Sequence, residues 1–162
     1  MPQSNIKIKD IEISNKYFMP EVIKLLDEGR TVTIRLKGFS MRPYLEDRRD
    51  KALLEKSNIP RINDIALAEI EKNKYVLHRI IKISGNDVIL RGDGNIQSES
   101  CKIDNIKGVA VGFYRKGRSK IELTNSINWH IYSFLWTNLF PIRRYLLYIY
   151  RNIWIKLFPI KL

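Results

Sequence analysis

The sequence contains very little of what builds disulfides and metal sites. Its 162 residues include one cysteine, Cys101, and two histidines, His78 and His130. A single cysteine cannot form an internal disulfide, and no Cys/His cluster has the spacing of a zinc site. We therefore expect a protein that needs neither a cofactor nor an oxidising compartment.

Long apolar runs are missing near the start of the sequence. Residues 1–18, MPQSNIKIKDIEISNKYF, are interrupted by charged residues, which argues against a signal peptide or a membrane span there. The uncharged stretch 123–142 has about the length of a span, but it contains polar residues and a proline near its end. We expect no clear transmembrane span, and a protein that is cytoplasmic or peripheral on the cytoplasmic membrane.

Acidic residues are outnumbered and unevenly spread. Lysine and arginine total 29 against 17 aspartates and glutamates, the net charge is +12, and no acidic residue follows Glu122. This balance favours an anionic partner such as nucleic acid, an acidic membrane surface or an acidic peptide, although a basic surface without such a role has the same composition. The apolar content of 44% is enough for a packed core and excludes a disordered chain.

Alternation of apolar and polar residues dominates the chain up to residue 123. Residues 20–29, PEVIKLLDEG, begin with proline, end with glycine and group their apolar side chains on one face, which predicts a short helix. Period-two segments then predict strands at 31–37, 51–56, 64–70, 74–83, 87–92 and 107–116. Together they predict a compact, mainly antiparallel β domain over residues 1–123.

Residues 124–162 differ in composition and predict a basic, aromatic helical tail. All three tryptophans lie there, and the apolar spacing predicts amphipathic helices over roughly 126–139 and 142–157. The second helix carries the apolar stripe Leu146, Leu147, Tyr150, Ile153, Trp154 and Leu157. Two arrangements remain open: helices lying in the interface of an anionic membrane, or a helix pair docked on the β domain.

Three residues are candidates for chemistry. The segment GFSMRP, residues 38–43, places Ser40 in a corner after a predicted strand, and a serine nucleophile needs a base within hydrogen-bond reach. His78 lies in a predicted strand with apolar neighbours, where burial favours the neutral imidazole that a base requires. Asp93, in LRGDGN, either makes a turn hydrogen bond or orients His78 as the carboxylate of a triad does.

These segments, taken in order, resemble the type I signal peptidase family. GFSMRPYLEDRRDKALLEK, DIALAEIEKNKYVLHRIIKI and VILRGDGN are similar to its Ser-Met-x-Pro box, its Lys-Arg or His-Arg strand and its closing Gly-Asp-x-Asn box. The resemblance covers about residues 31–112. It implies the antiparallel β fold shared by signal peptidases and LexA-like repressors. The His-Arg pair is similar to the endoplasmic-reticulum, archaeal and some Gram-positive enzymes, which pair serine with histidine.

The resemblance implies a serine endopeptidase without a cofactor. Ser40 would be the nucleophile, His78 the general base and Asp93 the aspartate of the closing box, in a Ser-His dyad or a Ser-His-Asp triad. The His-type enzymes commonly carry a second acidic residue shortly after this box, and Glu99 is the secondary candidate here. The expected partner is an extended polypeptide with small residues near the cleaved bond, with peripheral contact to an anionic membrane and no specific nucleic acid.

Two other functions remain open. A non-catalytic binding module would keep the same fold and use its basic aromatic tail for lipid or nucleic acid. A LexA-like self-cleaving regulator uses a lysine base and cuts at an Ala-Gly or Cys-Gly bond upstream of its serine. No alanine or cysteine precedes Ser40, which argues against this second alternative.

Overall fold

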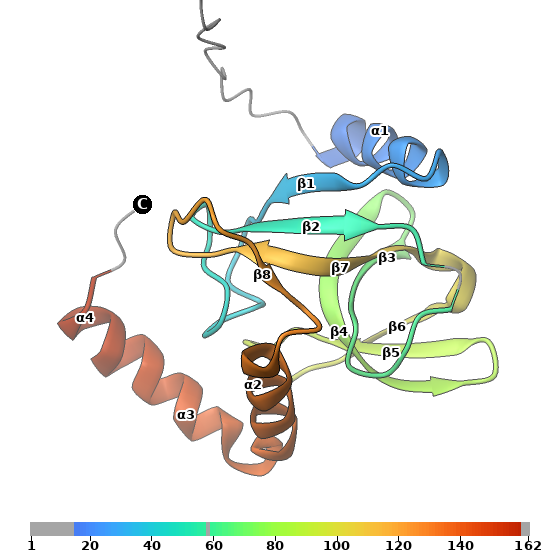
Figure 1. The fold of residues 1–162 in the computed structure, drawn as a ribbon. Coiled ribbons are helices and arrows are strands. Elements are labelled where there is room, and N and C mark those ends of the chain that lie inside the picture. Colours follow the sequence, from blue (N-terminus) through green and yellow to red (C-terminus); the bar gives the residue numbers. More distant parts are fainter. Residues whose placement is uncertain (1–14, 58, 160–162) are drawn as a thin grey trace, which may run out of the picture.

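The computed structural model describes residues 15–57 and 59–159. Within these residues the chain forms an antiparallel sheet of eight strands in the order β1-β2-β7-β3-β4-β5-β6, with β8 beside β7 (Figure 1). The strands are β1 Val32–Arg35, β2 Lys51–Glu55, β3 Ile65–Glu71, β4 Lys74–Ser84, β5 Asp87–Arg91, β6 Glu99–Lys102, β7 Ile106–Tyr114 and β8 Glu122–Leu123. A short 3-10 helix, η1 (Ile103–Asn105), joins β6 to β7. The predicted antiparallel β fold with helices at both ends is confirmed.

The N-terminal helix α1 (Asn15–Asp27) begins before the predicted position and contains Pro20 in its interior. Proline inside a helix costs roughly 3 kcal/mol because a backbone hydrogen bond is lost. The helix buries Met19, Val22 and Leu26 in the main core, and each such side chain contributes about 1.5–3 kcal/mol. This burial offsets the cost of the proline, so the helix begins at Asn15 and not at Pro20 as the sequence predicted.

Alternate residues of β3 enter two different apolar clusters. Ile65 and Leu67 belong to the main core, which also contains α1 residues, Phe113 and Trp129. Ala66 and Ala68 belong to a second cluster on the other side of β3, with apolar residues of β4, β5 and β6. Since both sides of the central strands are covered, a polar side chain on either face is held among apolar neighbours.

The hairpin of β4 and β5 contains a register shift. Ser84 pairs with Asp87 and Lys82 with Ile89, but the next pair is Ile80 with Leu90, followed by Arg79 with Arg91. One residue of β4, Ile81, therefore has no partner of its own, as in a β-bulge. Beyond the bulge, each residue of β4 faces a residue of β5 one position earlier than a regular hairpin would give.

The tail consists of α2 (Ile127–Asn138), a short 3-10 turn η2 (Phe140–Ile142) and a second helical stretch. This stretch is formed by α3 (Arg143–Ile149), the π-helical segment η3 (Tyr150–Trp154) and α4 (Ile155–Leu157). Figure 1 shows α2 beneath the sheet and the stretch from α3 to α4 rising at an angle from the lower end of α2. Helix α2 docks on the β domain, because Trp129, Ser133 and Trp136 are buried. Among the described residues, no helix has both the length and the apolar character needed to cross a membrane.

Candidate active site

His78 and Glu99 form the central contact of the candidate site. The Nδ1 atom of His78 lies 2.7 Å from a carboxylate oxygen of Glu99. An ionised carboxylate only accepts hydrogen bonds, so Nδ1 carries the hydrogen and donates it. In a neutral ring the other nitrogen, Nε2, is then unprotonated, which is the tautomer that a general base needs. The His78 side chain is 4% exposed and that of Glu99 is 32% exposed, so the pair reaches from the interior to the surface.

The strand registers explain why these two side chains meet. Ile80 pairs with Leu90, and Leu90 pairs with Glu99, so the three side chains share one face of the sheet. His78 lies two residues from Ile80 on β4 and therefore has the same orientation. Glu99 was the secondary acidic candidate from the sequence, and the structure places it at the His78 ring.

Asp93 lies at a different place from the one predicted for the orienting carboxylate. Its two carboxylate oxygens accept hydrogen bonds from Nε and Nη2 of Arg79 at 2.8 and 2.7 Å. The Tyr132 hydroxyl donates to the same carboxylate at 2.8 Å, and Nε1 of Trp136 donates to the Asp93 backbone carbonyl at 2.9 Å. The Asp93 carboxylate is thus engaged by Arg79 and Tyr132, and the contact to the His78 ring comes from Glu99 instead.

The β-bulge is the physical reason for this arrangement. In a regular continuation of the Ser84–Asp87 register, residue 78 would face residue 93. The shift at the bulge pairs Arg79 with Arg91, the last pair of the two strands, and the same register continued by one residue places Gly92 opposite His78. Asp93 then projects to the opposite face, where the Arg79 side chain also lies.

The Arg79–Asp93 pair is a buried ion pair under α2. Each side chain is 1% exposed. Burial lowers the pKa of Arg79, but the hydrogen bonds and charge of Asp93 outweigh it and the net shift is upward. Arg79 also donates to the Ser133 hydroxyl and, at 3.2 Å, to the backbone carbonyl of Asn63. Burial, reinforced by the charge of Asp93, raises the pKa of Tyr132 well above its usual value, so its hydroxyl stays a donor.

Ser40 packs directly against the turn formed by residues 92–95, Gly-Asp-Gly-Asn, which we call the closing turn. The backbone N–H of Gly94 donates to the Ser40 carbonyl at 2.7 Å. A Cβ atom added to Gly92 would lie 2.4 Å from that carbonyl oxygen and 3.0 Å from the Ser40 Cβ. Because Gly92 occupies the position facing His78, the turn brings Ser40 to the part of the sheet where His78 lies. Within the described residues the Ser40 hydroxyl and the His78 ring are not hydrogen bonded, and such bonds are often long in unliganded sites.

The second helical stretch of the tail holds both the Ser40 loop and the closing turn. The Tyr150 hydroxyl donates to the carboxylate of Glu46, which also accepts from Nε of Arg42 at 2.8 Å. Arg151 donates to the carbonyl of Gly94 at 3.0 Å. Burial and the bond to Glu46 raise the pKa of Tyr150. One helix thus fixes the segment that follows Ser40 and the turn that supports it.

An open groove runs beside Glu99. It has a volume of about 1050 Å³ and lies between residues 94–97 and residues of α3 and η3. The helical wall includes Arg144, Tyr145, Tyr148 and Arg151. A groove of this size, with Glu99 in its wall, has room for an extended peptide segment.

The supporting residues in the tail were not predicted from the sequence. Trp129, Tyr132, Ser133 and Trp136 have the spacing of one helix face, i, i+3, i+4 and i+7. That spacing was a usable signal for a docked face on α2. Nothing in the sequence indicates that the docked face would contact Asp93.

Comparisons of this chain with protein-family models, with curated proteins and with solved structures find no match.

Proposed function

We propose that this chain is a serine-type endopeptidase similar to the type I signal peptidases. Ser40 is the nucleophile, His78 the general base and Glu99 the carboxylate that orients the base. Asp93 is a positioning residue that holds the closing turn through Arg79. The observation that carries the proposal is the 2.7 Å contact between Nδ1 of His78 and Glu99, on the face where the closing turn supports Ser40.

The proposed reaction proceeds through an acyl-enzyme. His78 Nε2 takes the Ser40 proton while the oxygen attacks the carbonyl carbon of the scissile peptide bond. The C–N bond then breaks, the leaving amine takes the proton from His78, and an ester to Ser40 remains. Water attacks this ester, with His78 again accepting the proton, and the carboxylic acid product leaves as Ser40 regains its hydrogen. Glu99 stabilises the imidazolium in both halves of the reaction.

The substrate we propose is an extended polypeptide lying in the groove beside Glu99. The groove supports this choice because it opens along the side of the site and has room for several residues. A preference for small residues next to the cleaved bond follows from the resemblance to signal peptidases. We place the protein in the cytoplasm or on the cytoplasmic membrane.

A fluorophosphonate probe, which reacts with activated serines, tests the proposal. Wild-type protein should be labelled, Ser40→Ala should not, and His78→Ala should react at least about a hundred-fold more slowly. Ser84→Ala, which removes a hydroxyl at the exposed end of β4, is the matched control and should react like wild type. Labelling of Ser40→Ala at the wild-type rate would refute the assignment. A folded wild-type protein that is not labelled would favour the non-catalytic module.

A further inference from the structure

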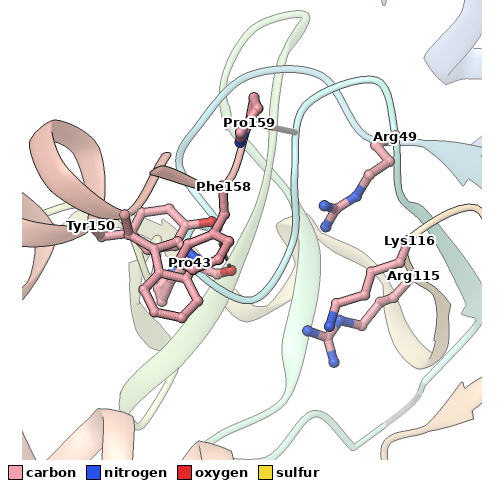
Figure 2. Close-up of a pocket in the computed structure, with 8 residues that line it drawn as sticks. Pro43, Arg49, Arg115, Lys116, Tyr150, Phe158 and Pro159 are labelled. Atoms are coloured by element: carbon pink, nitrogen blue, oxygen red, sulfur yellow. Dashed lines mark hydrogen bonds between the residues drawn. The ribbon is translucent and has the colours of Figure 1, made fainter. Parts of the chain in front are cut away.

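A second pocket lies where the β domain meets the end of the tail. Its volume is about 380 Å³. It is lined by Pro43, Arg49, Arg115, Lys116, Tyr150, Trp154, Phe158 and Pro159. Figure 2 shows the three cationic side chains on one side and Tyr150, Phe158 and Pro43 on the other. The pocket therefore has a cationic half from the β domain and a mainly apolar half to which the tail contributes its rings.

The cationic half is held in place by buried groups. Asp50 is 0% exposed and accepts from Nε and Nη2 of Arg49 at 2.8 and 2.9 Å, as well as from the backbone N–H of Lys116 at 2.8 Å. Arg115 donates to the Tyr44 carbonyl and to Glu122, and its guanidinium lies 3.5 Å from the centre of the Tyr44 ring. These contacts fix two guanidinium groups in position at the pocket.

The net charge of the side chains around the pocket is about +1. Arg49 pairs with Asp50, and Arg115 pairs with Glu122. The Lys116 ammonium has no carboxylate partner among the residues that the structure describes. A singly charged anion, such as a phosphodiester, matches this balance. A phosphate monoester with two charges would leave one charge unmatched.

The apolar half is strongly exposed. Trp154 and Phe158 are 54% and 58% exposed, their ring centres lie 4.7 Å apart, and Leu157 beside them is 67% exposed. Exposed large apolar side chains grouped next to fixed cations are typical of surfaces that rest in a lipid interface, with rings at headgroup depth. A small inorganic anion would make no use of this apolar group.

We propose that this pocket binds the phosphodiester headgroup of an anionic phospholipid. Lys116, Arg49 and Arg115 face the phosphate, while Trp154, Leu157 and Phe158 enter the interface. Fewer residues face the membrane in this proposal than the apolar stripe predicted from the sequence contains. Leu147 of that stripe is buried, and Tyr150 is bonded to Glu46. The proposal does not depend on the peptidase proposal, because its test measures binding to vesicles and not cleavage.

The experiment measures co-sedimentation of the full chain with vesicles of phosphatidylcholine alone or mixed with phosphatidylglycerol. Wild type should bind only the mixed vesicles. Lys116→Gln should weaken binding about five-fold, the contribution of one cation near an anionic surface. Trp154→Ala should weaken it about ten-fold, through the loss of apolar area in the interface.

Two control variants and one competitor make the test specific. Lys72→Gln removes an exposed charge from the turn between β3 and β4, and Phe134→Ala removes a ring that is 68% exposed on α2. Each should change binding less than about two-fold. Equal losses for Lys72→Gln and Lys116→Gln would refute a localised site, as would an absence of binding to mixed vesicles. Competition by millimolar inorganic phosphate that disappears in Lys116→Gln would show a site for a soluble anion, and would also overturn the proposal.

Discussion

The substitutions Asp93→Asn and Glu99→Gln separate the roles of the two carboxylates, because each removes one charge and keeps the side-chain shape. The Asp93–Arg79 pair is almost fully buried, at 1% exposure for each side chain. Removing one partner of such a pair costs about 3–5 kcal/mol because the other charge is left uncompensated. A domain of ordinary stability has about 5–15 kcal/mol in total. With a urea slope of about 2 kcal/mol per molar, Asp93→Asn should lower the unfolding midpoint by about 2 M.

Glu99→Gln should show the opposite profile. The Glu99 side chain is 32% exposed, and partly exposed pairs contribute about 1 kcal/mol or less. The urea midpoint should therefore fall by less than about 0.5 M. The reaction rate should fall much more, since a glutamine no longer stabilises the imidazolium; losses of about a hundred-fold to ten-thousand-fold are expected for an orienting carboxylate.

The assay combines urea unfolding with the rate of fluorophosphonate labelling, expressed per folded molecule. Unfolding of Asp93→Asn at the wild-type urea concentration would refute the structural role of Asp93. A Glu99→Gln variant that is destabilised by about 2 M urea, with an unchanged labelling rate of its folded fraction, would refute the role of Glu99.

Gly92→Ala should lower both stability, by about 1–3 kcal/mol, and the labelling rate per folded molecule, because the new Cβ would meet the Ser40 carbonyl at 2.4 Å. Gly108→Ala is the control: its new Cβ would meet the Glu55 backbone at 2.8 Å, so it should lower stability but not the labelling rate. Equal losses of labelling rate in Gly92→Ala and Gly108→Ala would show that contact with the Ser40 carbonyl is not the cause. The raised pKa of Tyr132 means that its contribution to stability is complete below pH 10 and is lost as pH rises toward the folded value. Above pH 10 the free energy of unfolding, measured in urea, should therefore fall less steeply with pH for Tyr132→Phe than for wild type. The difference in slope should be up to about 1.4 kcal/mol per pH unit, and equal slopes would contradict this role of Tyr132. Arg144→Gln should reduce kcat/KM about three-fold for peptides with an acidic residue in the groove relative to neutral ones, and an equal effect on both would show that it does not read substrate charge.

The strands that the sequence predicts are those with strong alternation and sufficient length. All six predicted segments correspond to strands. The missed strand β6, Glu99–Lys102, has four residues, of which only Cys101 is buried, and it lies at the edge of the sheet. Such a segment has no repeated apolar position from which a period can be read. The two-residue strand β8 is too short for any pattern.

The position of Asp93 could not be predicted because it depends on one unpaired residue. Residues 84–87, SGND, form the turn of the β4–β5 hairpin, and the spacing from this turn is consistent with a regular hairpin in which His78 faces Asp93. The bulge at Ile81 changes which residues face each other beyond it, and the sequence there, RIIKI, does not reveal the extra residue. Since one position of shift exchanges the two faces of a strand, a single bulge is enough to exchange the roles of two carboxylates.

The arrangement of the helical tail could also be predicted only in part from the sequence. Its two helical pieces were predicted close to their observed bounds, and docking was one of the two arrangements left open. Apolar spacing alone shows that a helix has a face to bury, not what covers it. For α2 the cover is the β domain. For Trp154 and Leu157, both more than half exposed, the structure leaves the face uncovered.

The bond from Tyr150 to Glu46 joins two residues that are 104 positions apart in the chain. During synthesis Glu46 is added long before its partner, and at about 5–20 residues per second the interval is roughly 5–20 s. For that period the segment after Ser40 has no Tyr150 to hold it, and until residues 127–138 have been made the Arg79–Asp93 pair has no α2 above it. The helical tail, which is made after the strands, therefore completes the surroundings of Ser40. A nascent chain that has formed its sheet still lacks the ordered loop that a serine nucleophile would require.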